Sequence, residues 1–185
     1  MGGARPFARA STAQPLEAPM AMVGLFWITE DAVYVGAEPT GTASGVRLTR
    51  DGVETLGLGN GASWSWDRVR RLEARDLVVR SAGRRLASMA LDSLVVLVTG
   101  DGELPPAFTV HVATLDESVE VSALPAAPGG IYLESERELS RILLERLADG
   151  TADVADLLAW RREQADDSTP RREEREALLR KWAGE

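Results

Sequence analysis

The chain has 185 residues, 44% of them hydrophobic, which is enough for one domain with an ordinary core and some extensions. It has no cysteine, so disulfides, thiolate metal ligands and cysteine nucleophiles are excluded together. Its net charge of −8 offers no dense positive field, which argues against a nucleic-acid partner and against an anionic membrane surface.

Residues 1–22 are predicted to form a flexible N-terminal arm. This segment carries Arg5 and Arg9 but no apolar stretch of the kind found in secretory signals. The longest apolar run of the chain, residues 94–98, is the size of a strand and far below the roughly 20 residues that span a bilayer. Together with the absence of cysteine, these features favour a cytoplasmic location.

Two strands, residues 23–29 and 32–37, are predicted to form the first hairpin, with its turn at Glu30-Asp31. The two-residue period of a strand places Phe26 and Ile28 on one face and Leu25 and Trp27 on the other. Because both faces are apolar, this strand is expected to be covered on both sides.

Residues 46–56 give the clearest hairpin pattern. Apolar and polar residues alternate on the first strand, and Asp51-Gly52 is expected to supply the turn, because glycine accepts a positive φ at little cost. The glycine-rich stretch that follows, residues 57–62, has no lysine and no helical pattern after it. It is therefore predicted to be a plain loop and not a phosphate-binding loop.

Further strands are predicted from Trp64 to Ala123. A long strand at residues 68–80 needs a bulge near Arg75-Asp76, because its apolar residues change parity there. A basic turn at residues 81–85 leads to a core strand at 88–99. The last hairpin pairs 108–112 with 119–123 around Asp116-Glu117, and residues 125–130 form a linker.

A helix is strongly predicted at residues 132–149. Ser135 and Glu138 match a capping box, and Gly150 can end the helix in a left-handed conformation. Four residues at helical spacing form one apolar stripe: Leu139, Ile142, Leu143 and Leu147.

Residues 151–185 are predicted to form a helical extension with many charged residues. Thr151 is expected to cap a helix that reaches Gln164, and Thr169-Pro170 opens another, since proline fits the first helical position. The last helix carries a narrow apolar face, and an isolated helix of this kind is marginal in water. Docking on the chain's own domain, docking on a partner and fraying all remain open. The face comprises Leu178, Leu179 and Trp182.

This order of elements resembles the bacterial pleckstrin-homology-like (PH-like) domains, of the actinobacterial type. Residues 25–35 resemble the opening strand, acidic turn and strand of that family, and Trp66-Asp-Arg-Val69 resembles an element before its central strand. The helix at 135–149 stands where the family's closing helix lies. The resemblance covers about 23–150. It implies an α+β fold, mainly antiparallel: a barrel of about seven or eight strands, closed by an amphipathic helix and followed here by two charged helices. The family has seven strands before the helix and about eight are predicted here, so a different small β-barrel or a sandwich is the alternative.

No constellation for catalysis or metal binding is visible in the sequence. His111 is the only histidine, so it lacks the partners that a catalytic or metal site requires. Asp92, Asp101 and Glu103 could offer oxygen ligands to a hard cation, but their spacing fits no calcium loop. No serine stands in a nucleophile elbow. The chain is therefore expected to be no enzyme and to need no cofactor.

A non-enzymatic protein-interaction module is the function that the sequence favours, with an unidentified protein as partner. Trp64, beside a glycine loop, is expected to be partly exposed, whereas Trp66 is expected in the core. A peripheral membrane module that binds anionic headgroups is the alternative, but the first hairpin turn is acidic where lipid-binding PH domains are basic. The candidate interaction surface comprises Trp64, Arg80, Arg84, Arg85, Leu178, Leu179 and Trp182.

Overall fold

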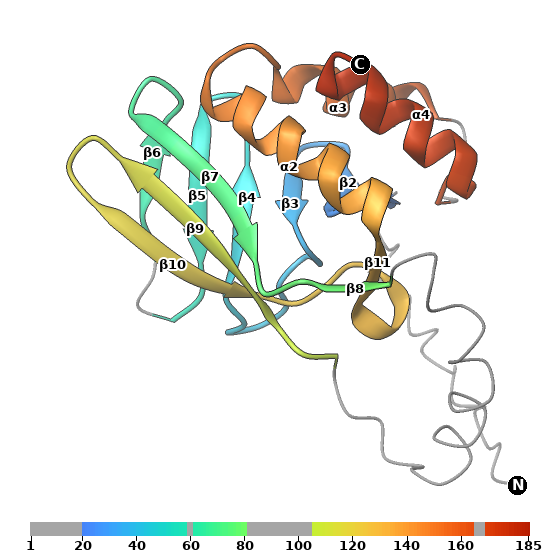
Figure 1. Ribbon diagram of the computed structural model, residues 1–185. Coiled ribbons are helices and arrows are strands. Elements are labelled where there is room, and N and C mark those ends of the chain that lie inside the picture. Colours follow the sequence, from blue (N-terminus) through green and yellow to red (C-terminus); the bar gives the residue numbers. More distant parts are fainter. Residues whose placement is uncertain (1–19, 59–60, 81–104, 165–168) are drawn as a thin grey trace, which may run out of the picture.

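The computed structural model describes residues 20–58, 61–80, 105–164 and 169–185 (Figure 1). Within them the chain is α+β, with mainly antiparallel sheets followed by three α-helices. The strands of these residues form three separate sheets, and none of the sheets closes into a barrel. No helix in the described part of the chain is both long and apolar enough to cross a membrane.

The largest sheet is a six-stranded antiparallel meander, in which each strand pairs with the next one along the chain. Short turns connect most of its strands, and this favours pairing between sequence neighbours. Its strands are β1 (Met20–Val23), β2 (Phe26–Thr29), β3 (Val33–Val35), β4 (Gly45–Leu48), β5 (Gly52–Leu56) and β6 (Ser63–Ser65).

Two smaller sheets follow. The second has the order β10-β9-β7, and the third is a parallel pair of β8 and β11. The strands are β7 (Val69–Arg75), β8 (Val78–Arg80), β9 (Phe108–Thr114), β10 (Ser118–Ala123) and β11 (Ile131–Leu133), with a short 3-10 turn at Pro128–Gly130 before β11. The helices are α2 (Glu134–Ala148), α3 (Val154–Glu163) and α4 (Arg172–Ala183).

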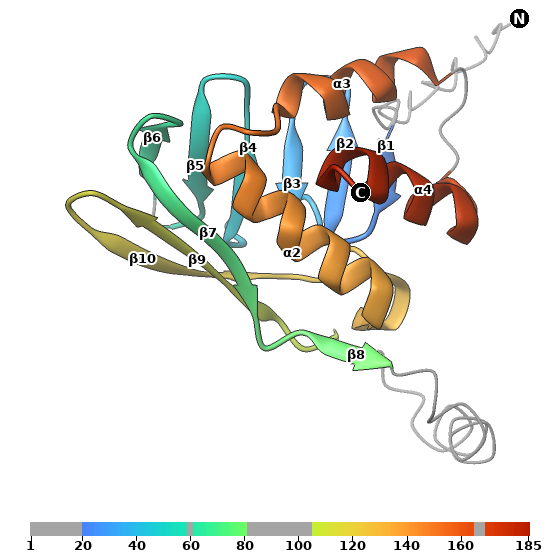
Figure 2. The same ribbon diagram turned by 45° about the horizontal axis from the view of Figure 1, so that its top comes forward.

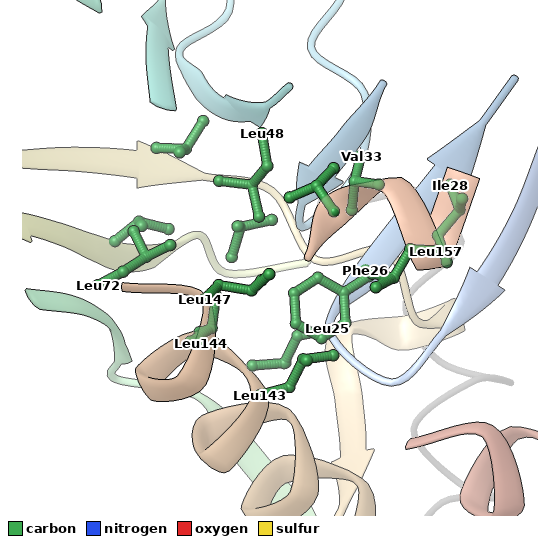
Figure 3. Packing of buried hydrophobic residues seen from close by; sticks show 14 of the residues in the cluster. Leu25, Phe26, Ile28, Val33, Leu48, Leu72, Leu143, Leu144, Leu147 and Leu157 are labelled. Atoms are coloured by element: carbon green, nitrogen blue, oxygen red, sulfur yellow. The ribbon is translucent and has the colours of Figure 1, made fainter. Parts of the chain in front are cut away.

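Helix α2 supplies the centre of the core. Its buried side chains Leu143, Leu144 and Leu147 point towards residues of both larger sheets, among them Phe26 and Leu72 (Figure 3). Each buried leucine contributes about 1.5–3 kcal/mol relative to an exposed one. The predicted apolar stripe is confirmed at three of its four positions, while Ile142 is only half-buried. Leu144, which was not part of the predicted stripe, is fully buried in the core.

The first predicted hairpin is wrong in its opening strand. A turn at Gly24 and Leu25 breaks residues 23–29 into β1 and β2, and β1 begins at Met20, inside the predicted arm. Gly24 makes the turn possible because it has a φ of +59°. The Leu25 amide donates to Ser140 Oγ of α2 at 3.2 Å, so the turn is tied to the helix.

The hairpins at 46–56 and 108–123 are confirmed as β4–β5 and β9–β10. The reason expected for Gly52 is wrong, however, because its φ is not positive. A Cβ at this position would lie 1.9 Å from the carbonyl oxygen of Trp64. Gly52 is therefore required by the close approach of β6, and the turn itself is centred on Arg50-Asp51.

The predicted bulge lies at the other end of its strand. The register of β7 against β9 shifts between Val69 and Arg71, which lets both Val69 and Leu72 face the core. At the predicted position, Asp76 adopts a φ of 62° and ends β7, and β8 then joins a different sheet. The predicted turn at 81–85 and strand at 88–99 lie outside the described residues.

The helices are confirmed, but all three of their predicted N-terminal signals are wrong. The N-cap of α4 is Arg171, so Pro170 precedes the helix and does not take its first position. Leu133 precedes α2 without any side-chain cap, so Ser135 and Glu138 form no capping box. The cap of α3 is Asp153, whose carboxylate accepts from the Ala155 amide at 2.8 Å, and not Thr151. The end of α2 is as predicted: Gly150 has a φ of 72°, and the Thr151 amide donates to the Arg146 carbonyl at 2.8 Å.

Candidate functional site

Helix α4 packs back on the chain's own fold. It lies beside α2 and near β1 (Figure 2). Leu179 is 0% exposed and Trp182 5% exposed, and the rings of Trp182 and of Trp160 in α3 pack in a T-shaped arrangement with their centroids 5.6 Å apart. Two of the three residues predicted to form a docking stripe therefore belong to the core, and only Leu178 keeps a partly exposed side chain.

A buried ion pair fixes α4 to α2. Glu136 is 3% exposed, its Oε1 accepts a hydrogen bond from Arg175 Nε at 2.8 Å, and Nη2 of the same guanidinium lies 2.8 Å from this oxygen in the ion pair. Arg175 also donates from Nη1 to the Pro170 carbonyl at 3.0 Å, so it holds the segment that enters α4. A charge-assisted pair in this environment imposes one position on the helix, because either partner left alone would be a buried, uncompensated charge.

Between α3 and α4 lies a hollow with a volume of about 430 Å³. We call it the α3–α4 groove. Its lining is mainly apolar and comes from both helices and from Pro170, and it also includes charged and amide side chains. The lining residues are Trp160, Gln164, Pro170, Glu174, Ala177, Leu178 and Lys181.

Helical spacing explains how α4 serves the core and the groove at once. Glu174, Ala177, Leu178 and Lys181 follow the i, i+3, i+4, i+7 pattern that places residues on one face of a helix. Leu179 and Trp182 lie on the adjoining face, which is turned to the core. The narrow apolar stripe predicted from the sequence therefore divides between two faces of α4: Leu178 lines the groove, whereas Leu179 and Trp182 face the core.

The aromatic part of the predicted interaction surface is not exposed. Trp64 is 5% exposed, and its Nε1 donates to Glu117 Oε1 at 2.9 Å. Trp66 is half-buried and donates from Nε1 to the Thr49 carbonyl at 2.9 Å. The expected roles of the two tryptophans are therefore reversed, because Trp64 lies opposite Val53 on the inner face of the sheet.

The predicted basic cluster is described only in part. Arg80 ends β8, in a different sheet from Trp64, so the structure does not bring these two residues into one strand ladder. Arg84 and Arg85 lie outside the described residues. The basic cluster therefore stays a prediction.

Of the residues considered for catalysis or metal binding, the structure describes His111. His111 is half-buried in β9, between Glu73 of β7 and Glu120 of β10. The pKa of Glu73 is lowered, mainly by its hydrogen bond from Arg75. No group of three or more potential metal ligands occurs in the described residues, and Asp92, Asp101 and Glu103 lie outside them.

A polar hollow at the β2–β3 turn is the main alternative to the groove. It has a volume of about 430 Å³ and includes Tyr34, Glu38 and Arg47. These groups already satisfy one another: Tyr34 donates to Glu38 Oε1 at 3.1 Å, and Arg47 donates from Nε to Glu54 Oε2 at 2.7 Å. Burial raises the pKa of Tyr34, which keeps its hydroxyl neutral. This hollow offers little unsatisfied chemistry to a ligand.

Sequence reasoning found Leu178 but missed Trp160 and Ala177. Both residues line the groove, but Trp160 reaches it from α3, so the sequence of α4 alone cannot show that they lie together. The spacing from Glu174 to Lys181 was the available signal, since it outlines a face distinct from that of Leu179.

No family model matches the chain, and comparisons with curated proteins and with solved structures also give no match. The geometry of the groove is therefore the ground for a functional proposal.

Proposed function

We propose that the chain is a non-enzymatic protein-interaction module and that the α3–α4 groove is its binding site. The observation that carries this proposal is an apolar groove whose wall, α4, is fixed from behind by Leu179, Trp182 and the Glu136–Arg175 pair. A groove held in this way is preformed, so a partner need not supply the free energy of ordering it.

The shape of the groove suits a helical partner. Two helices with partly exposed apolar side chains between them can accept a third amphipathic helix, which anchors on Trp160 and Leu178. Tryptophan is among the residues that contribute most to binding at interfaces. Gln164, Glu174 and Lys181 supply a polar rim of the kind that surrounds such anchors.

A PH-like fold is part of the proposal. It is supported by an antiparallel meander, a second sheet of three strands and a helix, α2, that follows them in the chain and packs on β7. The six strands of the first sheet depart from the family pattern.

A cytoplasmic location also belongs to the proposal. The membrane-associated alternative loses its aromatic anchor, because Trp64 is buried.

Photo-crosslinking in the native host tests the binding site. A benzophenone amino acid replaces Gln164, which lines the groove, or its neighbour Glu163, which is equally exposed but does not line it. We expect a discrete protein adduct from position 164 and none from position 163. The absence of any protein adduct from position 164, or identical adducts from both positions, would contradict the proposed function.

A further inference from the structure

The charged residues at the ends of the groove are arranged with two-fold self-complementarity. On α4, Glu174 and Lys181 are seven residues apart, about 10 Å along the helix axis. Ala177 and Leu178 lie midway between them, at the apolar centre of the same face. We propose that the occupant of the α3–α4 groove is helix α4 of a second copy of this chain, and this inference rests on the proposed function.

Antiparallel packing of two α4 helices satisfies both charges. A two-fold axis through the midpoint of Ala177 and Leu178 sets Glu174 of each copy against Lys181 of the other, which forms two opposite-charge pairs. An isologous interface requires a surface that is complementary to itself, and a charge of each sign at equal distances from the axis meets that requirement. Such a dimer is closed, so it does not extend into a filament.

Both charges are available for this pairing. Glu174 and Lys181 are exposed, and within the described residues neither forms an ion pair with another side chain. The hydrogen bond that Glu174 accepts is from the Arg171 amide at 3.0 Å, and this leaves its second carboxylate oxygen for a partner. Lys181 is also the only lysine of the chain.

The centre of the face allows two helices to approach. Ala177 is small and exposed, and Leu178 and Trp160 are only partly buried, so apolar surface is present where the axis passes. Helices that pack in this way lie about 8–10 Å apart. A contact through one face of each copy is at the small end of specific interfaces, and we expect a dissociation constant on the order of 10–100 µM.

Charge reversal provides the test, by sedimentation equilibrium at low salt on the full chain. Glu174→Lys alone or Lys181→Glu alone turns both pairs into like-charge pairs, and each variant is expected to dimerise at least about tenfold more weakly than the unmodified chain. A one-to-one mixture of the two variants regains both opposite-charge pairs. The mixture is therefore expected to form a heterodimer with an affinity close to that of the original homodimer.

Matched controls separate the interface from the fold. Glu173→Lys makes the same charge change on α4 outside the groove and is expected to leave dimerisation unchanged. Glu174→Lys removes the bond to the Arg171 amide, whereas Lys181→Glu removes no hydrogen bond within the described residues, so the second variant keeps the test valid if the first is less stable. In the unmodified chain, a carbodiimide is expected to join Glu174 to Lys181 between copies.

The possible outcomes distinguish the two levels of the proposal. A chain that stays monomeric at about 1 mM, or a mixture that regains no affinity, overturns self-association. If position 164 then crosslinks to a different protein, the proposed function stands and only the identity of the partner is wrong. If position 164 crosslinks to nothing, both are wrong. An adduct of twice the chain's mass, together with recovery in the mixture, supports both.

Discussion

Replacement of Gly24 by alanine is expected to lower the free energy of unfolding by about 2–5 kcal/mol, the sum of a strain term and an overpacking term. Gly24 has a φ of +59°, a conformation that costs other residues about 1–2 kcal/mol. In addition, a Cβ there would lie 2.4 Å from Ser140 Oγ and 2.9 Å from Leu179 Cδ1. The added methyl group would push apart β2, α2 and α4 at the point where they meet.

Gly41→Ala is the matched control for this change. Gly41 has a φ of +60°, but a Cβ there would have nothing within 4 Å. The control therefore retains the strain term of about 1–2 kcal/mol and lacks the overpacking term. Urea denaturation of both variants measures the difference. Equal losses of stability would show that Gly24 is not packed against Ser140 and Leu179.

Glu136→Ala is expected to cost about 3–5 kcal/mol, because it leaves the Arg175 guanidinium largely buried without its carboxylate partner. Part of this cost is the loss of the attachment of α4 to α2. The double variant Glu136→Leu with Arg175→Met removes both charges, and we expect it to recover most of the stability, since apolar pairs of similar volume often replace buried ion pairs without loss.

Glu138→Ala on the same helix controls for the loss of a carboxylate as such. Glu138 pairs with Arg141 at 2.7 Å, but both side chains are well exposed, and such surface pairs contribute about 0–1 kcal/mol. Thermal denaturation of the variants gives the comparison. If Glu136→Ala were no more harmful than Glu138→Ala, the pair with Arg175 would not be buried as described.

Local sequence patterns predicted which strands and helices form better than they predicted where each one begins and ends. The alternation in residues 46–56 and the leucines of α2 indicated hairpins and a helix that the structure confirms. The caps at Ser135 and Thr151 were wrong because cap chemistry depends on where the chain enters the helix, and tertiary packing sets that entry. Leu133 enters α2 directly from β11, and Asp153 lies nearer to α3 than Thr151 does.

Contacts between distant segments account for the larger errors. The exposures of Trp64 and Trp66 were assigned the wrong way round, because the sequence does not show that β6 ends at Ser65: Trp64 is held in the sheet opposite Val53, whereas Trp66 follows the strand. The turn at Gly24 and Leu25 is held by Ser140, which is 115 residues from Leu25 in the chain. The parity change in β7 was noticed, but the site of the bulge depends on the register with β9.

The candidate site was predictable only as a stripe on the last helix. The sequence left open whether Leu178, Leu179 and Trp182 meet the chain's own domain or a partner. The structure assigns two of them to the core because Glu136, 39 residues from Arg175, provides a buried anchor for α4. No local sequence pattern indicates a buried ion pair between two residues so far apart in the chain.

The claim on which the groove depends is that α4 belongs to the cooperative core of the molecule. Hydrogen exchange of backbone amides in the full chain tests it most directly. We predict that the amides of Leu179 and Trp182 exchange as slowly as those of Val110 and Val112 in β9, through the same global opening. Exchange of the α4 amides at rates near those of an unstructured chain, while β9 stays protected, would contradict the account.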